Sequence, residues 1–198
     1  MAGMRKSDKD EHTLSDLELI RRCSEGDPRA QELLYKRYFS YAMSVCIRYT
    51  RNRYEAMEIV NDSFMKVLDN IREHDGSGSF RSWYGRILVN SAIDNYRRNA
   101  RHNSHLQISE IESTEDCEPE ISAELSANEI LSLFDLLPDH YRVTFNLYEI
   151  EGYSHEEIGQ MLDISSSTSR SNLSRAKKML RELYKRNFNP GNSSNEQV

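Results

Sequence analysis

Residues 153–184 read YSHEEIGQMLDISSSTSRSNLSRAKKMLRELY, a pattern that predicts two short helices joined by a tight turn. Ser154 and Glu157 have the spacing of a capping box, which marks the start of a helix. Asp163 is a residue type that tolerates positive φ, so the first helix is predicted to end there. A second helix begins in the serine run that follows. The stretch is therefore predicted to be a helix-turn-helix, in which Gly159 lets the two helices approach closely.

The second helix of this pair has a packed side and a basic side. Ser169, Leu173, Ala176 and Leu180 share one side at helical spacing, and residues 165–186 contain seven Lys or Arg and one Glu. Such helices enter DNA grooves, although Lys and Arg also cover surfaces that only face water. The charge balance and Gly159 favour contact with duplex DNA. The outward residues expected to contact DNA are Thr168, Arg170, Ser171, Arg175 and Lys178.

The composition is typical of a soluble globular protein, since 37% of the 198 residues are apolar and 29% are charged. No apolar run is long enough to cross a membrane, and residues 1–13 lack the apolar core of a secretion signal. We therefore expect a cytoplasmic protein without membrane insertion. Three scattered cysteines without CxxC spacing are expected to be buried or free rather than paired in a disulfide or bound to zinc.

The net charge of −6 is unevenly distributed. Residues 104–129 hold eight Asp or Glu and no Lys or Arg, and without them the chain is close to neutral. Basic residues cluster at 97–101 and 165–186. The acidic segment has no clear period, and its composition is that of a flexible linker. The sequence thus predicts local basic surfaces on either side of an acidic connection.

Four helices are predicted before this linker. Ser15 caps the first, which ends near Gly26, and Asp27 caps the second, with Pro28 at its first position. The third follows a break at Asn52. Its apolar stripe contains Ala56, Val60, Phe64, Val67 and Ile71. Carboxylates line another side of it, at Glu55, Glu58, Asp62 and Asp69.

Carboxylates at this spacing can bind metal in helical bundles, but the accompanying motifs do not fit. A di-iron site needs Glu-x-x-His motifs, which are absent from the sequence, and the HExxH pattern that begins at His155 fails at Gly159. We expect no metal, no other cofactor and no catalytic site. The acidic ridge is then either a solvated face or a docking surface for a basic partner, and the pattern alone favours the solvated face.

The fourth helix, residues 80–102, reads FRSWYGRILVNSAIDNYRRNARH and has two stripes. One is apolar and is expected to face the core, at Phe80, Tyr84, Ile87, Leu88, Ala92 and Tyr96. The other interleaves the sole Trp with arginines and an amide, at Trp83, Arg86, Asn90, Asp94, Arg97 and Arg101. Such a stripe suits single-stranded nucleic acid, where aromatic rings stack on bases. Periodicity supports equally a buried Trp83 beside solvated arginines.

The predicted fold is all-α, with two small helical domains joined by the acidic linker. After the linker, apolar residues recur from Leu125 to Leu137, Pro138 interrupts, and a further helix runs from Asp139 to Ile150. We find no strand pattern and no internal repeat. The expected division is a disordered N-terminus at 1–13, a first domain at 14–103, the linker at 104–123, a second domain at 124–186 and a disordered tail at 187–198.

Two motifs in this order resemble bacterial RNA polymerase sigma factors of the sigma-70 family. The first is FRSWxxRIxxNxxxDxxRR, from residue 80, and the second is LPxxYRxxFxLxxxExYSxEEIxxxLxISxSTxRSxLSRAKxxL, from residue 137. The sequence shows no match to the further domains of housekeeping sigma factors. In this respect it resembles the extracytoplasmic-function (ECF) group. The resemblance implies a non-enzymatic subunit that binds core polymerase, directs it to promoters and assists strand opening.

The resemblance also implies partners for the residues that match. Glu55, Glu58, Asp62 and Phe64 would bind polymerase, which contacts sigma factors through its clamp and flap. The melted non-template strand of the minus-ten element would meet Phe80, Trp83, Arg86, Asn90, Arg97 and Arg98. The minus-thirty-five duplex would meet Thr168, Arg170, Ser171, Arg175 and Lys178. The linker would thread toward the polymerase active site, and an anti-sigma factor is a further candidate partner.

Four positions depart from the family pattern. Ser165, Ser167, Ser169 and Asn172 stand where relatives more often have Pro, Gly, an apolar residue and a basic residue. We expect Ser169 on the packed face, and we expect Asn172 to remove a phosphate contact. Two other functions fit parts of the pattern. An autonomous helix-turn-helix regulator with a sensing domain predicts tight duplex binding by the protein alone, and a nucleic-acid-processing enzyme predicts a catalytic constellation.

Overall fold

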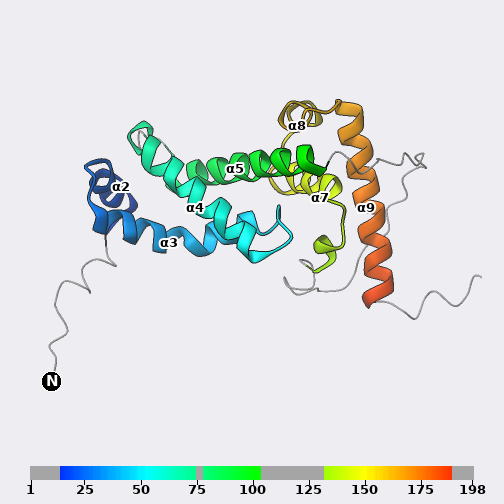
Figure 1. Ribbon diagram of the computed structural model, residues 1–198, viewed down its shortest axis with the longest axis horizontal. Coiled ribbons are helices and arrows are strands. Elements are labelled where there is room, and N and C mark those ends of the chain that lie inside the picture. Colours follow the sequence, from blue (N-terminus) through cyan, green and yellow to red (C-terminus); the bar gives the residue numbers. More distant parts are fainter. Residues whose placement is uncertain (1–13, 75–77, 104–131, 189–198) are drawn as a thin grey trace, which may run out of the picture. The chain divides into compact units, whose positions relative to one another are not determined.

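The computed structural model describes residues 14–74, 78–103 and 132–188, and these residues form helices without strands (Figure 1). The chain divides into two compact units, Met1–Asn95 and Tyr96–Val198. This confirms the all-α prediction. The predicted linker at 104–123, the N-terminus at 1–13 and most of the predicted tail lie outside the described residues. The last helix continues to Phe188, two residues past the predicted end of the second domain.

The first unit begins with the helical hairpin of α2 (Asp16–Ser24) and α3 (Pro28–Cys46). The Ser15 hydroxyl accepts from the Glu18 backbone N–H at 3.2 Å, and the Asp27 carboxylate accepts from the first backbone amides of α3. Gly26, with φ +82°, supplies the left-handed turn between them. Both predicted caps are confirmed.

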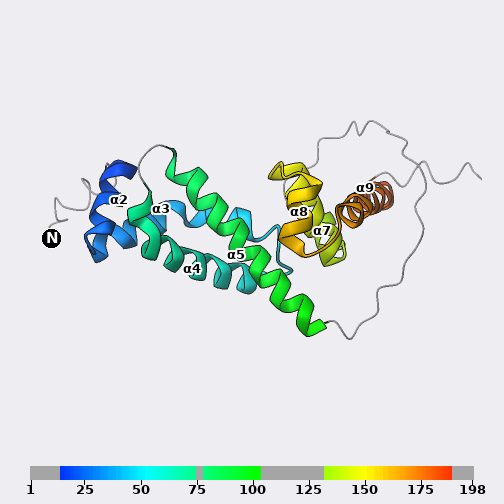
Figure 2. The ribbon, with the colours of Figure 1, turned by 90° about the horizontal axis from the view of Figure 1, so that it is seen from above.

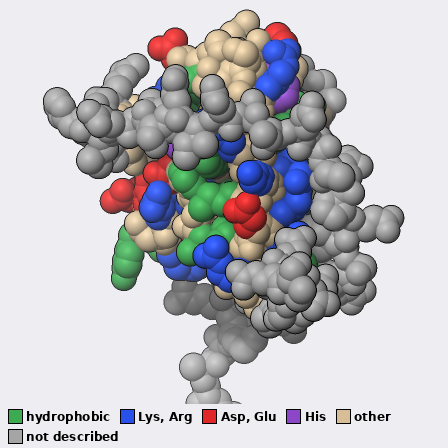
Figure 3. All heavy atoms as spheres, turned by 90° about the vertical axis from the view of Figure 1, so that its right-hand side faces the viewer, with side chains coloured by type: hydrophobic (Ala, Val, Ile, Leu, Met, Phe, Trp, Pro, Cys, Tyr) green, Lys and Arg blue, Asp and Glu red, His purple; other side chains and the backbone are tan. Residues whose placement is uncertain are grey.

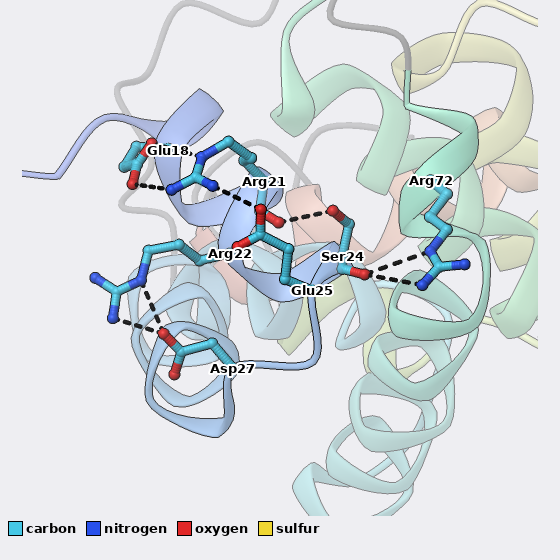
Figure 4. A network of polar contacts seen from close by, with 7 residues as sticks. All are labelled: Glu18, Arg21, Arg22, Ser24, Glu25, Asp27 and Arg72. Atoms are coloured by element: carbon cyan, nitrogen blue, oxygen red, sulfur yellow. Dashed lines mark hydrogen bonds and ion pairs between the residues drawn. The ribbon is translucent and has the colours of Figure 1, made fainter.

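Ion pairs close the end of this hairpin (Figure 4). The Arg21 guanidinium lies between two carboxylates of its own helix, Glu18 at 2.8 Å and Glu25 at 2.6 Å. Arg22 reaches past the turn to Asp27, with Nη2 and Oδ2 2.6 Å apart. Because Asp27 also caps α3, this second pair ties the end of α2 to the start of the next helix.

Helix α4 (Arg53–Asn70) follows the predicted break, and the Asn52 side chain caps it by accepting from the Glu55 backbone N–H at 2.9 Å. It ends in the short 3₁₀ turn η1 (Ile71–Glu73). From this turn Arg72 donates to the Ser24 carbonyl through Nε and Nη2, at 3.3 and 3.2 Å (Figure 4). The end of α4 is thus hydrogen-bonded to the end of α2.

Aromatic rings join α3 and α4 to α5 (Phe80–Asn103). The Phe64 ring lies edge-on to Tyr35 at 5.0 Å and to Tyr84 at 6.4 Å, and Tyr38 meets Phe80 at 4.7 Å between ring centroids. Tyr84, Leu88 and Ala92 of the predicted apolar stripe are buried, as is Phe80, whereas Ile87 and Tyr96 are partly exposed. This cluster is the core of the first unit.

Two cysteines lie in the same core. Cys23 and Cys46 are buried free thiols, as the sequence predicted. Burial raises the pKa of Cys23 to about 11 and that of Cys46 to about 12, so both thiols are neutral at physiological pH. They fill space as small apolar groups. Cys117 lies outside the described residues.

The second unit contains α7 (Asp139–Phe145), the π-helical turn η2 (Asn146–Ile150), α8 (His155–Leu162) and α9 (Ser166–Phe188) (Figure 2). The single helix predicted from Asp139 to Ile150 is therefore correct in extent but changes to a wider turn in its second half. Both α7 and α8 pack against α9. The core consists of Leu133, Leu137, Val143, Leu147, Ile158, Leu173 and Ala176.

Candidate nucleic-acid interface

Helices α8 and α9 form the predicted helix-turn-helix. The Ser154 hydroxyl accepts from the Glu157 backbone N–H at 3.2 Å, and the Glu157 carboxylate accepts from the Ser154 backbone N–H at 2.8 Å, which completes the capping box. Asp163 ends α8 in the left-handed conformation, with φ 58° and ψ 46°. A Cβ at Gly159 would lie 2.8 Å from the Ile164 carbonyl oxygen. The predicted start, turn and close approach are all confirmed.

The predicted faces of α9 are largely confirmed. Ser169, Leu173 and Ala176 are buried, whereas Leu180 is partly exposed. Asn172 is also buried, at 8% exposure, and the expectation that it removes a phosphate contact stays a prediction. Helical spacing brings it beside Ser169 and Ala176. Among the predicted DNA contacts, Thr168, Arg170 and Lys178 are exposed, and Ser171 and Arg175 are partly exposed.

Polar contacts hold the exposed start of α9. The Ser165 hydroxyl accepts from the Thr168 backbone N–H at 3.0 Å and lies 2.8 Å from the Ser167 hydroxyl. Arg170 forms an ion pair with Glu156 of α8 at 2.9 Å. Figure 3 views the α9 side, where basic side chains are spread around an apolar patch. The geometry suits an anionic partner such as the DNA backbone.

The acidic ridge of α4 is only partly a free surface. Glu58 and Asp62 are exposed. The Glu55 carboxylate instead accepts from the Asn95 side chain at 2.6 Å, which ties α4 to α5. Phe64 is 7% exposed and packs in the aromatic core. Phe64 was expected to bind polymerase, but its ring is buried in this structure, whereas Glu58, Asp62 and Asp69 of the ridge are exposed.

The second stripe of α5 is exposed around its Trp. Arg86, Asn90 and Arg98 are exposed, and Arg97 is partly exposed. Trp83 is partly exposed, and its ring lies 5.3 Å from His74 and 5.7 Å from Phe80 between centroids.

Trp83 is therefore not the fully buried core residue that periodicity also allowed, because part of its ring is accessible while it packs against His74 and Phe80. Phe80, also expected to contact DNA, is only 2% exposed. The Phe80 ring is therefore not accessible to DNA in this structure. It packs against Trp83 instead.

Two family models match the chain. Sigma-70 region 2 matches residues 34–102, and Sigma-70, region 4 matches residues 127–180. The chain belongs to the sigma-70 family. The region 2 match contains the acidic ridge and the Trp83 stripe, and the region 4 match contains the helix-turn-helix. Both sigma-70 regions thus fall on the surfaces described above.

Curated relatives of the chain are ECF sigma factors. An ECF RNA polymerase sigma-E factor of Haemophilus influenzae is 29% identical over 178 residues, covering 84% of this chain and 94% of the relative. The protein of the same name from Escherichia coli K12 is 28% identical, covering 84% and 93%. A solved structure of the sigma factor RpoE in complex with the anti-sigma factor NepR from Bartonella quintana aligns at 21% identity with a TM-score of 0.48, covering 78% of this chain and 96% of that one.

Sequence reasoning missed the contacts that link sigma-70 region 4 internally. Lys177 of α9 pairs with Glu149 of η2 at 2.9 Å, and Arg170 pairs with Glu156. The sequence shows opposite charges at these positions. No pattern within a helix indicates that residues 28 or 14 positions apart form ion pairs. None of the helices among the described residues has the length and apolarity needed to span a membrane.

Proposed function

We propose that this sigma-70 protein is an ECF sigma factor that binds core RNA polymerase, directs it to specific promoters and promotes strand opening. The observation that carries the proposal is the order of the two regions, each with an accessible polar face. Region 2 presents exposed carboxylates and a half-exposed Trp, and region 4 presents a basic helix. It acts as a non-enzymatic subunit, in the cytoplasm where promoters and polymerase meet.

We assign polymerase docking to the α4 ridge. Glu58 and Asp62 are exposed carboxylates one helical turn apart, and they would meet basic side chains of the polymerase clamp. Glu55 supports them through its hydrogen bond to Asn95. Phe64 holds the helix in place from beneath. The flap of the polymerase would hold the second unit.

We assign the melted non-template strand of the minus-ten element to the stripe on α5. Trp83 offers one ring face for stacking on a base, a contact that contributes about 1–3 kcal/mol. Arg86, Asn90, Arg97 and Arg98 would bind the phosphates and base edges beside it. The aromatic contacts of Trp83 with Phe80 and His74 keep the ring in one orientation before DNA arrives.

We assign the minus-thirty-five duplex to the outward face of α9, through Thr168, Arg170, Ser171, Arg175 and Lys178. On this proposal, 14–103 and 124–186 are the two working domains, and the acidic linker at 104–123 joins them. Polymerase holds both at the spacing of the promoter elements. An anti-sigma factor is a proposed further partner, as the resemblance to ECF sigma factors implies.

Run-off transcription with purified core polymerase tests the proposal. The full chain is added to core polymerase on fragments of its own genome, and the start sites are mapped. We expect new transcripts that share two upstream elements. Tight, specific duplex binding by the chain alone without any transcript would instead support an autonomous regulator. Chemical change of the nucleic acid without polymerase would support an enzyme.

A further inference from the structure

A buried polar contact lies where the two helices of the helix-turn-helix meet. Ser169 of α9 is 0% exposed, and its hydroxyl oxygen lies 3.0 Å from Nδ1 of His155, the first residue of α8. A serine that deep in a helix interface needs a partner, because an unsatisfied buried hydroxyl is costly. His155 supplies that partner.

The contact continues through His155 to a third element. Its ring stacks on Tyr148 of the π turn η2, with centroids 4.4 Å apart and an interplanar angle of 20°. Tyr148, His155 and Ser169 therefore form a contact chain that links η2, α8 and α9. We call these three residues the interhelical chain.

The interhelical chain persists across the titration of His155. Burial, and then the nearby Arg170 and Lys177 cations, lower the pKa of His155, and Glu156 opposes them. Neutral Nδ1 accepts from the Ser169 hydroxyl, and protonated Nδ1 donates to the same oxygen. The hydrogen bond thus exists in both states, and the contact acts as a fixed spacer.

The other polar links between these elements are weaker constraints. The Arg170–Glu156 and Lys177–Glu149 pairs join long side chains with much of their surface in solvent, and salt screens such pairs. Close contact at Gly159 fixes the separation of α8 and α9 at the turn. The interhelical chain fixes their relative rotation further along, since it has a directional bond and a flat ring stack.

We propose that His155 and Ser169 are positioning residues that set the orientation of α9, and thereby its selectivity for bases in the minus-thirty-five element. This inference rests on the proposed function. Arg170 follows Ser169 directly, and Ser171 and Arg175 lie within two turns of it. Hydrogen bonds to base edges weaken steeply with angle, so a small rotation of α9 costs base discrimination before it costs phosphate binding.

The test compares four holoenzymes, with wild-type chain, Ser169→Ala, His155→Phe and the double variant. Phenylalanine keeps a flat ring for Tyr148 but lacks Nδ1. Each is measured on the promoter defined by start-site mapping and on the same promoter with its upstream element altered, well below the unfolding temperature. The readout is the ratio of the two open-complex affinities, because partial unfolding lowers both affinities alike and leaves the ratio unchanged.

We expect each single change to reduce the ratio about fivefold or more, and the double change to reduce it no further, since both remove the same bond. Ser40→Ala, at an exposed serine of α3, is the matched control and should keep the wild-type ratio. A ratio within twofold of wild type in both single variants, or fully additive losses, would overturn the inference. Absence of any transcript with the wild-type chain would instead overturn the proposed function itself.

Discussion

Gly159 allows α8 and the start of α9 to approach closely because it has no side chain. A methyl group there would lie 2.8 Å from the Ile164 carbonyl oxygen, which is backbone and cannot rotate away. Alanine would gain about 1 kcal/mol of helix propensity over glycine, but overpacking against backbone costs about 2–3 kcal/mol, the upper part of the usual range. We predict that Gly159→Ala lowers the unfolding free energy of the second unit by about 1–2 kcal/mol, measured by urea denaturation.

Gly78→Ala is the matched control for this prediction. A Cβ at Gly78 would have no neighbour within 4 Å, and its backbone is not left-handed. The change should leave the unfolding free energy within about 0.5 kcal/mol of wild type. An equally stable Gly159→Ala variant would show that α8 and α9 can move apart at no cost.

Single residues also show where sequence reasoning succeeds and where it stops. Spacing placed Ser169 on the packed face correctly, because helical period is a local property. Motif membership assigned Phe64 to a partner, yet its ring is buried among residues 20 to 30 positions away. The Glu55–Asn95 bond spans 40 positions. Such contacts depend on how helices pack, which neither period nor motif specifies.

At the scale of the element, the capping box of α8 is a pH-sensitive support. Hydrogen bonds from the backbone and then the side chain of Ser154 lower the pKa of Glu157 below its ordinary 4.5. A depressed folded-state pKa means that the stabilisation is present above the unfolded value and is lost as pH falls through the folded one. We predict that Ser154→Ala destabilises the second unit by about 1 kcal/mol at neutral pH.

Thermal unfolding of wild type and Ser154→Ala between pH 7 and pH 3 measures this effect. The difference between the two proteins should shrink below about pH 4.5, as Glu157 becomes protonated. Ser40→Ala, in the middle of α3, lacks a cap to lose and should not shift the transition. A difference that stays constant over the whole pH range would mean that the hydrogen bond from the Ser154 hydroxyl to the Glu157 carboxylate does not stabilise the cap.

Caps made the helices the most predictable elements of the chain. Ser15, Asp27 and Ser154 each cap the helix that was expected to start there, because a cap acts within four residues. The π turn at Asn146–Ile150 had no such signal. Its residues continue the apolar pattern of α7, and no cap or turn residue marks the change to a wider turn.

At the scale of the whole molecule, charge is separated by region. The exposed carboxylates of α4 and the basic face of α9 suit partners of opposite sign, a basic protein surface and DNA. We predict that the double variant Glu58→Lys with Asp62→Lys binds core polymerase about tenfold more weakly, because like charges then face each other. Equilibrium binding to labelled core polymerase at low and high salt measures the change.

Glu73→Lys is the matched control, since Glu73 is an exposed acid on η1 outside the ridge. It makes the same change of charge per residue and should bind normally. The defect of the double variant should also diminish as salt rises. If affinity were unchanged at low salt, docking through the α4 ridge would be wrong even though the family assignment would stand.

The π turn also determines which genetic changes the second unit tolerates. A π turn is an α-helix with one residue inserted, so losing one codon there would return it to ordinary α geometry. The residues on either side of the turn would keep nearly the same phase, because the wider turn already absorbs the extra residue, and the change would fall on the side chains within the turn itself. Tyr148 would then leave the ring of His155. A frame-preserving deletion of one residue would thus disturb the interhelical chain more than a polar substitution on the surface of α9.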